Sequence, residues 1–370
     1  MLIFRKRLLP YSETFIAAQG YGLRRYRPVF TGFQPDRRGL HHVRPEDCEL
    51  LTRSRATAQL LRLPMRVGVR PSRSWLARLA AHQPALLHAH FGADGIAALP
   101  LARALGLPLA VTFHGHDIVG DLRPRYRRHL RRLFAQPFTA IAVSRFIQEQ
   151  LLRAGCPAEK IIQHYIGTDL SAFTGARADA ADPTVLFVGR LVEKKGCSYA
   201  IRAVAALQER IPGLRFVVVG DGPLRTELEA QAGASLRNVR FLGAQPPEKV
   251  REQMRSAWLL CGPSVTTRTG DREGLGMVFL EAQASGLPVA GFRSGGIPEA
   301  VADGESGLLV AEGDLAGLTE AMLKILQDST LRRKLSAKAV LHVREHFELS
   351  RQCAKLEEIY DRLIAASAAA

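Results

Sequence analysis

Short apolar runs alternate with longer amphipathic stretches through the second half of the chain. Each run has four or five residues, rich in valine, leucine and phenylalanine, and each is followed by a stretch with helical spacing. Such strands are buried on both faces, so the alternation is typical of a parallel sheet covered by helices on both sides. We predict strands at 185–188, 216–219, 239–242, 258–261, 289–292 and 307–310, with helices near 198–210, 224–232, 247–257 and 276–285 and one from 297.

The first half follows the same rhythm more loosely. Apolar runs predict strands at 1–4, 86–89, 109–113 and 140–143, whereas the pattern between residues 37 and 73 is weak. The small, polar segment 174–183 ends at a proline and is typical of an interdomain linker. We therefore predict an α/β chain of two Rossmann-like, doubly wound domains. If the two sheets face each other, ligands would bind in a central cleft beyond the carboxyl ends of the strands.

The composition is that of a folded protein. The chain has 370 residues, of which 47% are hydrophobic and 23% charged, and this excludes a disordered chain. We find no apolar run of the ~18 residues that a membrane span needs, and the first ten residues lack a signal-peptide cleavage site. The five cysteines are far apart with no C-x-x-C pair, so neither a disulfide framework nor a zinc site is indicated. We expect a cytoplasmic protein.

Positive charge is concentrated in the first half. Of the net charge of +16, nearly all lies in residues 1–180, which hold 27 of the 51 basic residues and 12 of the 35 acidic ones. The densest segment, 123–134, predicts a basic amphipathic helix. Its arginines either contact an anionic surface, at roughly 1 kcal/mol per side chain, or form a solvated face. The arginines expected to contact a membrane are Arg125, Arg128, Arg131 and Arg132. No nucleic-acid motif accompanies them, so we expect no nucleic-acid partner.

Two cations follow the strand predicted at 185–188. Arg190 and Lys195 lie in a glycine-flanked loop before the next helix and can converge on one anion just beyond the strand. Gly189 lets the backbone approach that anion closely. A charged strand-to-helix loop without a ligand explains the same residues, so both interpretations stay open at this point.

Two carboxylates stand eight residues apart in the next candidate element. Glu273 lies in a glycine-rich loop, and Glu281 lies inside the helix that begins near Gly276. The free amides of residues 275–277 form the positive end of that helix and suit a diphosphate. A nucleotide-sugar has the matching layout, with its sugar toward Glu273 and its ribose toward Glu281. Two solvated acids on a surface helix are the alternative, which the flanking glycines and the apolar run 277–280 disfavour.

Polar residues also follow strands of the first half. His114 comes directly after the strand at 109–113, where a side chain can face a cleft, although a structural histidine is the alternative. His88 and His90 repeat this arrangement one strand earlier. A metal site at His114, His116 and Asp117 would lack a fourth ligand, so we expect no metal. The polar turn that contains Ser12 follows the first strand, with Ser12 as a possible helix cap and an acceptor or phosphate contact as its functional interpretation.

Together these residues resemble family 4 of the retaining glycosyltransferases, which have the GT-B fold. The resemblance rests on the G-R-L-x-x-x-K-G stretch at 189–196, the G-D-G-P-L-R stretch at 220–225, Phe241-Leu-Gly243 and the Glu-x7-Glu element, in the family's order and spacing. It covers residues 183–310 and, less closely, 86–150. The Ser-Glu-Thr-Phe, His-Ala-His-Phe and Thr-Phe-His-Gly-His-Asp stretches look most like the subgroup that builds exopolysaccharide and lipid-linked repeat units.

The resemblance implies roles for the matching residues. Arg190 and Lys195 would neutralise the leaving diphosphate, Glu281 would bind the ribose, and Glu273 would hold the donor sugar with nearby amides. The implied catalytic residues are His114, Glu273, Arg190 and Lys195. The implied donor-binding residues are Gly189, Arg190, Lys195, Gly222, Leu242, Glu273, Gly274, Leu275, Gly276, Met277 and Glu281. The implied acceptor contacts are Ser12, Glu13, Thr14, His90 and His116. The first three lie in the first loop, where many family members have a glycine pair and this chain has Ser-Glu-Thr.

The resemblance also implies a reaction. A hexose would move from GDP-mannose or a UDP-hexose to a saccharide with retention of configuration, without a cofactor. No metal is required, because two cations and a helix end supply the charge. Residues 1–172 would take the acceptor and residues 173–349 the donor, with the helix at 350–370 packing back on the first domain. A polyprenyl-diphosphate-linked acceptor would place the enzyme peripherally on the inner face of the cytoplasmic membrane. The alternatives are a soluble small-molecule acceptor, a sugar-nucleotide epimerase and a non-catalytic nucleotide-sugar-binding protein.

Overall fold

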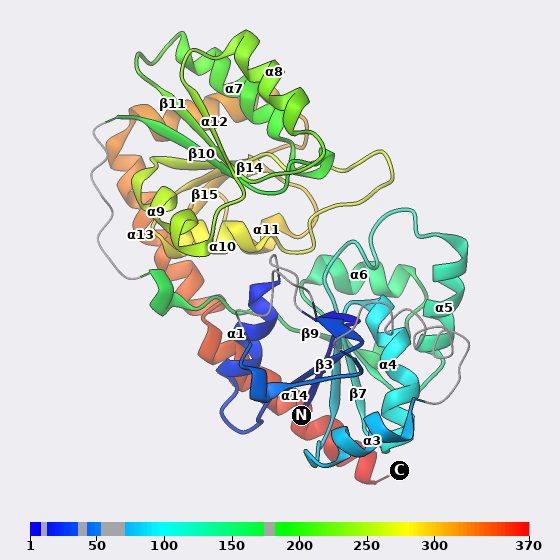
Figure 1. Cartoon of the computed structure of the whole chain (residues 1–370). Helices are drawn as coiled ribbons and strands as arrows, with labels where there is room; N and C mark the ends of the chain where they lie inside the picture. The colour runs from blue at the N-terminus through cyan, green and yellow to red at the C-terminus, as the bar shows by residue number, and fades with distance from the viewer. Residues whose placement is uncertain (9–12, 36–42, 53–70, 174–181, 370) are drawn as a thin grey trace. The chain divides into compact units, whose positions relative to one another are not determined.

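The chain folds into two units, each with its own parallel sheet (Figure 1). The computed structural model describes residues 1–8, 13–35, 43–52, 71–173 and 182–369. The first unit comprises Met1–Gly167 together with Leu349–Ala370, and the second comprises Thr168–Glu348. The chain therefore returns to the first unit after it has completed the second.

The first unit is built on a seven-stranded sheet in the order β5-β3-β1-β6-β7-β8-β9. Its central strands are buried along their whole length, as continuous apolar runs require. The strands are β1 (Leu2–Phe4), β3 (Val29–Gly32), β5 (Cys48–Leu50), β6 (Leu87–His90), β7 (Leu109–Phe113), β8 (Thr139–Ala142) and β9 (Ile161–Gln163), and a separate parallel pair joins β2 (Arg7–Leu8) to β4 (Gln34–Pro35).

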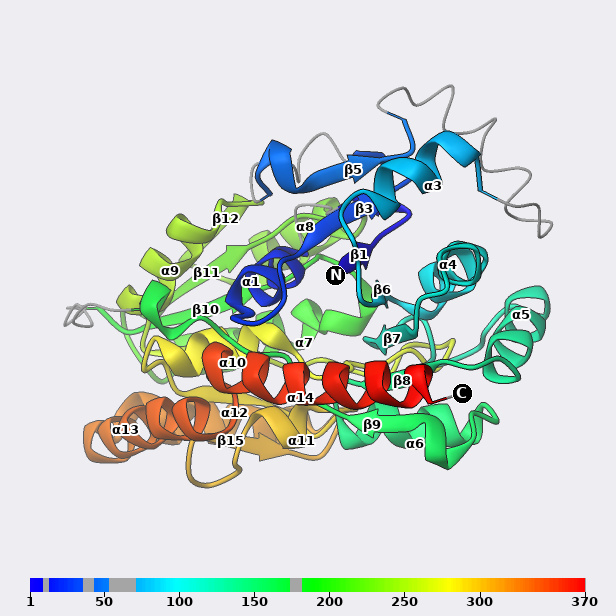
Figure 2. The same cartoon turned by 90° about the horizontal axis from the view of Figure 1, so that it is seen from below.

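Helices cover both faces of this sheet. One group packs around α4, which contacts β6 and β7, and α1 lies beside the C-terminal helix α14 (Figure 2). The apolar side chains of α14, among them Leu356 and Ile359, join Ile3 of β1 and Ile141 of β8 in one buried cluster. The helices are α1 (Thr14–Gly22), α3 (Arg73–Ala80), α4 (Gly92–Leu105), α5 (Pro124–Phe134), α6 (Arg145–Arg153) and α14 (Leu349–Ala368), with short 3-10 turns η2 (Pro45–Asp47) and η3 (Ala158–Lys160).

The second unit is built on a six-stranded parallel sheet in the order β12-β11-β10-β13-β14-β15. Its strands are β10 (Thr184–Val188), β11 (Arg215–Val219), β12 (Val239–Gly243), β13 (Leu259–Gly262), β14 (Val289–Phe292) and β15 (Gly307–Val310). Its helices are α7 (Cys197–Gln208), α8 (Arg225–Ser235), α9 (Pro247–Ser256), α10 (Met277–Ala284), α11 (Ile297–Ala300), α12 (Leu315–Gln327) and α13 (Ser329–His346), with 3-10 turns η4 (Leu170–Phe173) and η5 (Glu193–Lys195).

Local sequence explains where several helices begin. Asp314 caps α12 by accepting a hydrogen bond from the Gly317 amide, and Asp328 caps α13 by accepting two backbone hydrogen bonds. Ser144 caps α6 in the same way. Each carboxylate or hydroxyl oxygen satisfies amides that have no partner inside the helix, and such a cap is typically worth about 1 kcal/mol.

Each sheet has one point at which the strand order reverses. In the second unit β10 lies between β11 and β13, and in the first unit β1 lies between β3 and β6. The loops that follow the two strands at such a point diverge to opposite faces of the sheet and leave a crevice, where doubly wound folds bind their ligands. Functional residues are therefore expected at these two points.

The predicted α/β architecture with two doubly wound parallel sheets is confirmed. The strands predicted between residues 185 and 310 are all present, with ends shifted by at most one residue. The sequence analysis missed β2, β3, β4, β5 and β9. The last two are three-residue edge strands, and β5 contains a glutamate, so their short half-buried sequences carry little apolar signal. Their positions follow from pairing with a neighbouring strand.

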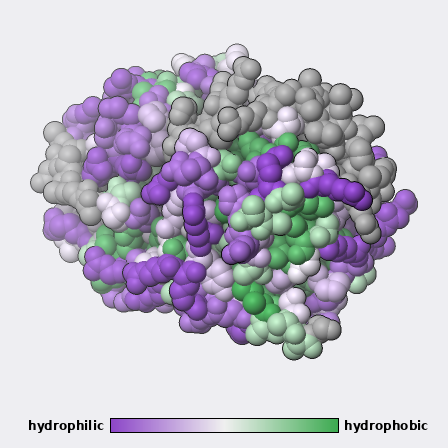
Figure 3. Space-filling model, turned by 60° about the horizontal axis from the view of Figure 1, so that its bottom comes forward, coloured by the Kyte–Doolittle hydropathy of each residue, from purple (hydrophilic) through white to green (hydrophobic). Residues whose placement is uncertain are grey.

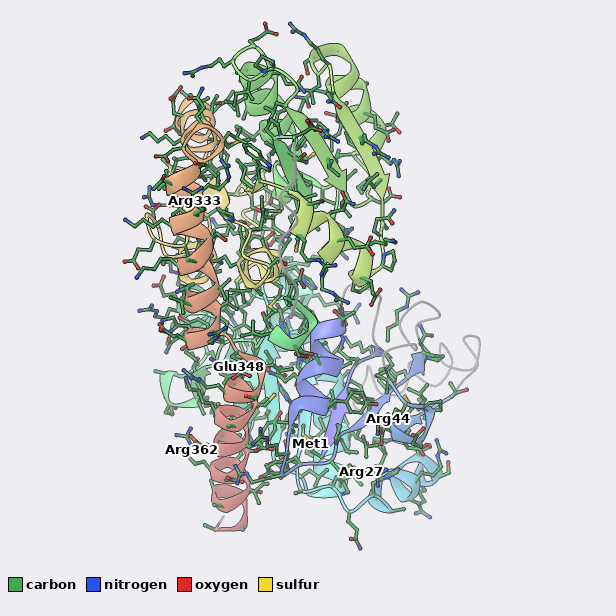
Figure 4. All side chains as sticks on the ribbon, turned by 90° about the vertical axis from the view of Figure 1, so that its left-hand side faces the viewer. Met1, Arg27, Arg44, Arg333, Glu348 and Arg362 are labelled. Carbon is green, nitrogen blue, oxygen red and sulfur yellow. The ribbon has the colours of Figure 1, made fainter. Side chains whose placement is uncertain are left out.

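The boundaries of the observed units along the sequence differ slightly from those of the predicted domains 1–172 and 173–349. The chain enters the second unit at Thr168, because Thr168 bridges to Glu348 and the η4 turn packs against α10. It leaves that unit at Glu348, which Figure 4 labels between α13 and α14. Of the predicted linker 174–183, residues 174–181 lie outside the described residues.

The surface shows few large apolar side chains. Among the described residues, Leu152 and Leu341 are the large hydrophobic residues that are exposed. Figure 3 shows one face of the molecule, on which hydrophilic side chains, in purple, lie around apolar areas, in green, the broadest of which lies right of centre. In the described part of the chain we find no helix with the length and apolar character that crossing a bilayer demands.

Candidate active site

Two ion pairs tie together the loops at the reversal point of the second unit. The loop after β10 carries Lys194 and Lys195, and the loop between β13 and α10 carries Asp271 and Glu273. Lys195 Nζ lies 2.9 Å from Glu273 Oε1, and Lys194 Nζ lies 3.0 Å from Asp271 Oδ2. Residues that are far apart in sequence therefore form one cluster of charges in the crevice of this sheet.

Glu273 is buried and ionised. Burial by itself raises the pKa of a carboxyl group, but the charges of Lys195 and Lys194 outweigh it and hold the pKa of Glu273 below its usual value. The contact with Lys195 is an ion pair of the kind that stabilises only when both partners are present. The cluster therefore holds a fixed carboxylate beside a lysine that anions can reach.

Close backbone packing fixes the shape of this cluster. Gly295 has φ 56°, and a Cβ built there would stand 2.2 Å from the Glu273 carbonyl oxygen, so a side chain at this position would push the loop away. The Gly296 amide donates to the same carbonyl at 2.9 Å. The turn after β14 therefore packs against the backbone of the Glu273 loop and fixes its position.

The helix α10 begins immediately after this loop. Its N-cap is Gly276, in the left-handed conformation, and no side chain caps its first amides. One turn into the helix lies Glu281, which is half-buried and whose carboxylate makes no hydrogen bond to another described residue. Burial raises the pKa of Glu281 to about 7, although Arg251 and Lys195 oppose this shift. The crevice thus offers free amides and an unpartnered carboxyl group on one helix.

The remaining predicted donor residues belong to adjacent loops of the same sheet. Arg190 is exposed and forms no side-chain bond among the described residues. A Cβ built on Gly222 would stand 2.4 Å from the Leu191 carbonyl oxygen, so the loops after β10 and β11 are in close contact. Leu242 is half-buried at the end of β12, and its carbonyl accepts a hydrogen bond from the Gln245 amide group at 2.5 Å. All predicted donor residues therefore lie at the carboxyl edge of one sheet.

Histidines gather at the corresponding edge of the first unit. His114 follows β7 and is half-buried, with its Nε2 atom 3.1 Å from Nδ1 of His90. Its ring centroid lies 4.4 Å from Phe91 and 5.2 Å from Phe15. Burial lowers the pKa of His114 well below its usual value, and the nearby positive charge of Arg5 lowers it further. His114 is therefore neutral at physiological pH.

Arg5 is a feature of this edge that the sequence analysis missed. It follows β1, and its guanidinium binds both carboxylate oxygens of Glu13, at 2.6 and 2.9 Å, and one oxygen of Asp94 at 2.6 Å. It also lies 4.2 Å above the ring of Phe91, whose φ of 73° is rare for a residue with a side chain. Such strain persists where the surroundings fix the backbone, and it gathers at functional sites. The sequence signal that could have identified Arg5 is its position directly after a buried strand.

The structure changes the predicted acceptor set. His90 was expected to contact an acceptor, but its side chain is 1% exposed and lies against His114, so it has no surface with which to bind one. Glu13 is engaged by Arg5, whereas Thr14, at the start of α1, is half-buried. His116 is exposed, with its ring 4.9 Å from Phe91. Ser12 lies outside the described residues.

The Asp117 carboxylate serves the backbone. One oxygen accepts hydrogen bonds from the His114 and Gly115 amides, and the other accepts one from the Gly92 amide at the start of α4. Asp117 thus fixes the His114 loop against the end of β6. In the described residues, no three histidine, cysteine, aspartate or glutamate side chains are grouped as metal ligands.

The predicted basic helix is α5. Its apolar residues Leu130, Leu133 and Phe134 are buried, and its hydroxyl-bearing Tyr126 donates to the Asp117 carbonyl oxygen. All the arginines predicted for membrane contact are exposed, and none forms an ion pair with an acid of the described chain: Arg125, Arg128, Arg131 and Arg132. The helix therefore presents uncompensated positive charge to its surroundings.

Comparison with known families finds two matching models. Residues 25–172 match "Glycosyltransferase Family 4" and residues 173–341 match "Glycosyl transferases group 1". The amylovoran biosynthesis glycosyltransferase AmsK of Erwinia amylovora is 32% identical over 281 residues, which cover 74% of this chain and 69% of that protein. A GDP-mannose-dependent alpha-(1-6)-phosphatidylinositol monomannoside mannosyltransferase of Mycolicibacterium smegmatis is 34% identical over 254 residues, covering 64% of this chain and 66% of that protein.

Solved structures share the fold. Anabaena Alr3699/HepE in complex with UDP aligns with a TM-score of 0.78 at 20% identity, covering 98% of this chain and 99% of that one. WaaG, a glycosyltransferase involved in lipopolysaccharide biosynthesis, aligns with a TM-score of 0.67 at 18% identity, covering 96% and 99%. Both are GT-B proteins, so the expectation of that fold class is confirmed.

Proposed function

The chain belongs to glycosyltransferase family 4, and from that premise we propose that it transfers a hexose from a nucleoside-diphosphate sugar to a saccharide acceptor with retention of configuration. The observation that carries this proposal is the cluster at the reversal point of the second sheet. There the Lys195–Glu273 pair, the unpartnered Arg190 and the uncapped start of α10 lie at one edge. Cations and free amides at such an edge suit a diphosphate.

Each group has a part in the proposed reaction. Arg190, Lys195 and the first amides of α10 stabilise the negative charge that develops on the diphosphate as its bond to the sugar C1 breaks. The acceptor oxygen bonds to C1 from the same face, and its proton passes to the leaving phosphate oxygen. Glu273, held by Lys195, accepts hydrogen bonds from hydroxyls of the donor sugar, and Glu281 accepts those of the ribose. These side chains supply the positive charge that a divalent metal gives in other transferases.

The two candidate donors are GDP-mannose and a UDP-hexose. The names of one relative from Mycolicibacterium smegmatis and one from Corynebacterium glutamicum specify GDP-mannose, whereas the structural neighbour HepE was crystallised with UDP and UDP-glucose. The base would meet the end of β12, where Leu242 is half-buried and its carbonyl oxygen accepts a hydrogen bond from the Gln245 amide group. Binding of the separate nucleotides therefore decides this point.

We propose further that the acceptor is a lipid-linked saccharide, used in the synthesis of an exopolysaccharide or another cell-surface glycan. The support is the exposed, unpaired arginine face of α5 together with the activities in the relatives' names. A carrier such as polyprenyl diphosphate is anionic and lies at a membrane surface, and the arginine face would bring the enzyme there. A soluble acceptor is the second candidate.

The first test compares two neighbouring lysines. Lys195→Ala should weaken UDP-sugar or GDP-sugar binding and lower turnover about tenfold or more, since each removed charge-assisted contact is worth roughly 1.5–3 kcal/mol. Lys194→Ala is the matched control, because it breaks the parallel ion pair to Asp271 but leaves Lys195 in place. Calorimetry with chelator present measures affinity, and the proton NMR spectrum of the product reports its anomeric configuration. Equal kinetics of both variants would contradict the assignment of this site.

A further inference from the structure

Three histidine rings lie in a row within the first unit. His88 and His90, on alternate positions of β6, have ring centroids 4.4 Å apart, and His90 and His114 have centroids 5.3 Å apart in a stacked arrangement. His88 and His90 are each 1% exposed, whereas His114 is half-buried. The row thus runs from the core of the unit to its functional edge.

The inner end of the row is fixed. His88 Nδ1 is 2.6 Å from the Tyr360 hydroxyl of α14, and its Nε2 is 2.6 Å from the Thr112 hydroxyl of β7. Both nitrogens of His88 therefore have a partner. His90 packs on this fixed ring, and its Nδ1 atom faces Nε2 of His114 at 3.1 Å.

Both outer histidines are neutral. Burial lowers the pKa of His90 and of His114 well below the usual value, and the charge of Arg5 beside them acts in the same direction. His88 lowers the pKa of both rings, His114 also lowers that of His90, and His116 also lowers that of His114. A neutral imidazole carries one N–H and one bare nitrogen, and the hydrogen bond made by one nitrogen decides the state of the other.

Only two proton arrangements satisfy the His90–His114 contact. If His90 Nδ1 donates, both rings carry their proton on Nδ1, and His114 presents an N–H group outward. If His114 Nε2 donates, both rings carry their proton on Nε2, and His114 presents a bare Nδ1. The second arrangement gives each ring the tautomer that an isolated neutral histidine prefers, because Nδ1 is nearer the electron-withdrawing backbone and is the less basic nitrogen.

We propose that His90 is a positioning residue whose Nδ1 accepts a hydrogen bond from the Nε2–H of His114 and so leaves His114 Nδ1 as a bare hydrogen-bond acceptor for a substrate hydroxyl. The functional part of this inference rests on the proposed transferase activity, for which the family resemblance implies His114 as a catalytic residue. A bare Nδ1 orients a hydroxyl whose hydrogen points at the ring, and it cannot bind a group that offers only an acceptor. His90 thereby acts on the substrate through His114 and without touching it.

The direct test is nitrogen NMR of histidine side chains in the whole protein labelled with nitrogen-15. The His114 signals, identified by their loss in His114→Gln, should show a protonated Nε2 and a bare Nδ1. In His90→Leu the His114 tautomers should become mixed, because Leu offers no partner. A protonated His114 Nδ1 in the unaltered protein, or an unchanged His114 spectrum in His90→Leu, would overturn the proposal.

Kinetics then separate positioning from stability. His90→Leu should lower kcat about tenfold or more with little change in the donor KM, since small misplacements of a reacting group are costly. His90→Asn should recover most of the loss, because its amide oxygen replaces Nδ1 as the acceptor. Tyr360→Phe is the matched control: it removes a buried hydrogen bond from the same row at His88 and should lower stability without changing the His114 tautomer.

The outcomes distinguish the two proposals. If the NMR result is as expected but His114→Gln retains full transferase activity, the tautomer assignment stands and the role of His114 in the reaction is wrong. If transferase activity depends on His114 but His90→Asn is no more active than His90→Leu, the positioning role of His90 is wrong.

Discussion

At the scale of single residues, Glu281 has the environment that most distinguishes a binding group from a structural one. It is half-buried, it has no hydrogen-bond partner among the described side chains, and its pKa is raised to about 7 by burial. When a buried carboxyl group without a hydrogen-bond partner ionises, the ligand-free folded protein becomes less stable. Such a cost is retained where the ionised form is needed for a ligand.

This leads to a prediction for stability against pH. In the folded state Glu281 keeps its proton up to about pH 7, whereas in the unfolded chain it loses it near pH 4.5. The stability that protonated Glu281 contributes to the folded protein is therefore fully present below pH 4.5 and is lost as the pH rises through about 7. Glu281→Gln should raise the stability of the free protein at pH 8 by an amount on the order of 1–3 kcal/mol, since one pKa unit is about 1.36 kcal/mol, and should change little at pH 4.5.

Thermal unfolding at the two pH values provides the measurement. The same variant should bind the nucleotide-sugar more weakly at pH 8, because an amide oxygen is a poorer acceptor for the ribose hydroxyls than a carboxylate is. Glu320→Gln on α12 is the control, since Glu320 is exposed and pairs with Arg210 at the surface. A destabilised Glu281→Gln at pH 8 would contradict the assigned environment.

At the scale of elements, α5 combines an ordinary core contact with an uncommon surface. Its apolar stripe packs in the first unit, and Lys160 supports its C-terminal end by donating to the Phe134 and Gln136 carbonyl oxygens. The opposite face carries arginines and no acid. The proposed contact with an anionic surface rests on this exposed arginine face.

The corresponding prediction concerns lipid binding. Changing Arg128, Arg131 and Arg132 to Glu should weaken binding to anionic vesicles roughly a hundredfold or more, since each basic side chain near such a surface contributes about 1 kcal/mol. Neutral vesicles and a salt series serve as references. The matched control makes the same charge change on α13 at the exposed residues Arg333, Lys334 and Lys338, of which Arg333 is labelled in Figure 4. If both triple variants weaken binding to anionic vesicles equally, the loss depends only on net charge, and the proposed role of α5 is contradicted.

At the scale of the whole molecule, the chain closes its first unit with its last helix. α14 places Leu356, Ile359 and Tyr360 in the buried cluster of that unit, and Glu357 accepts hydrogen bonds from the Arg24 and Arg25 amides. The His164 ring also binds the Gln352 carbonyl oxygen. The first unit is therefore incomplete until the second has been made.

Loss of Tyr360 should accordingly weaken one unit alone. Tyr360→Ala removes a fully buried ring and its bond to His88 and should cost about 3–5 kcal/mol, the range for deleting a large core side chain. Hydrogen exchange should rise in the peptides of residues 1–167 and change little in those of 184–343. Phe292→Ala, in the core of the second unit, is the reciprocal control. Uniform loosening by both variants would mean that the two units unfold as one.

The sequence by itself determined the architecture of the second unit and the identity of its charged groups. Its strands are continuous apolar runs, and buried parallel strands need no distant partner to be recognised. Flanking glycines and a predicted helix start identified four charged residues from the sequence: Arg190, Lys195, Glu273 and Glu281. Short edge strands such as β5 could not be recognised from the sequence, because they form only by pairing with a neighbouring strand.

Only the tertiary structure decided how these groups meet. Lys195 and Glu273 are distant in sequence, and the strand order that makes β10 and β13 neighbours brings them within 2.9 Å. The same holds for Arg5 between Glu13 and Asp94, and for His90, which the sequence presented as a contact residue and the fold buried behind His114. The physical reason is that residue type and local periodicity act along the chain, whereas burial, pKa and pairing depend on groups that only the folded sheets bring together.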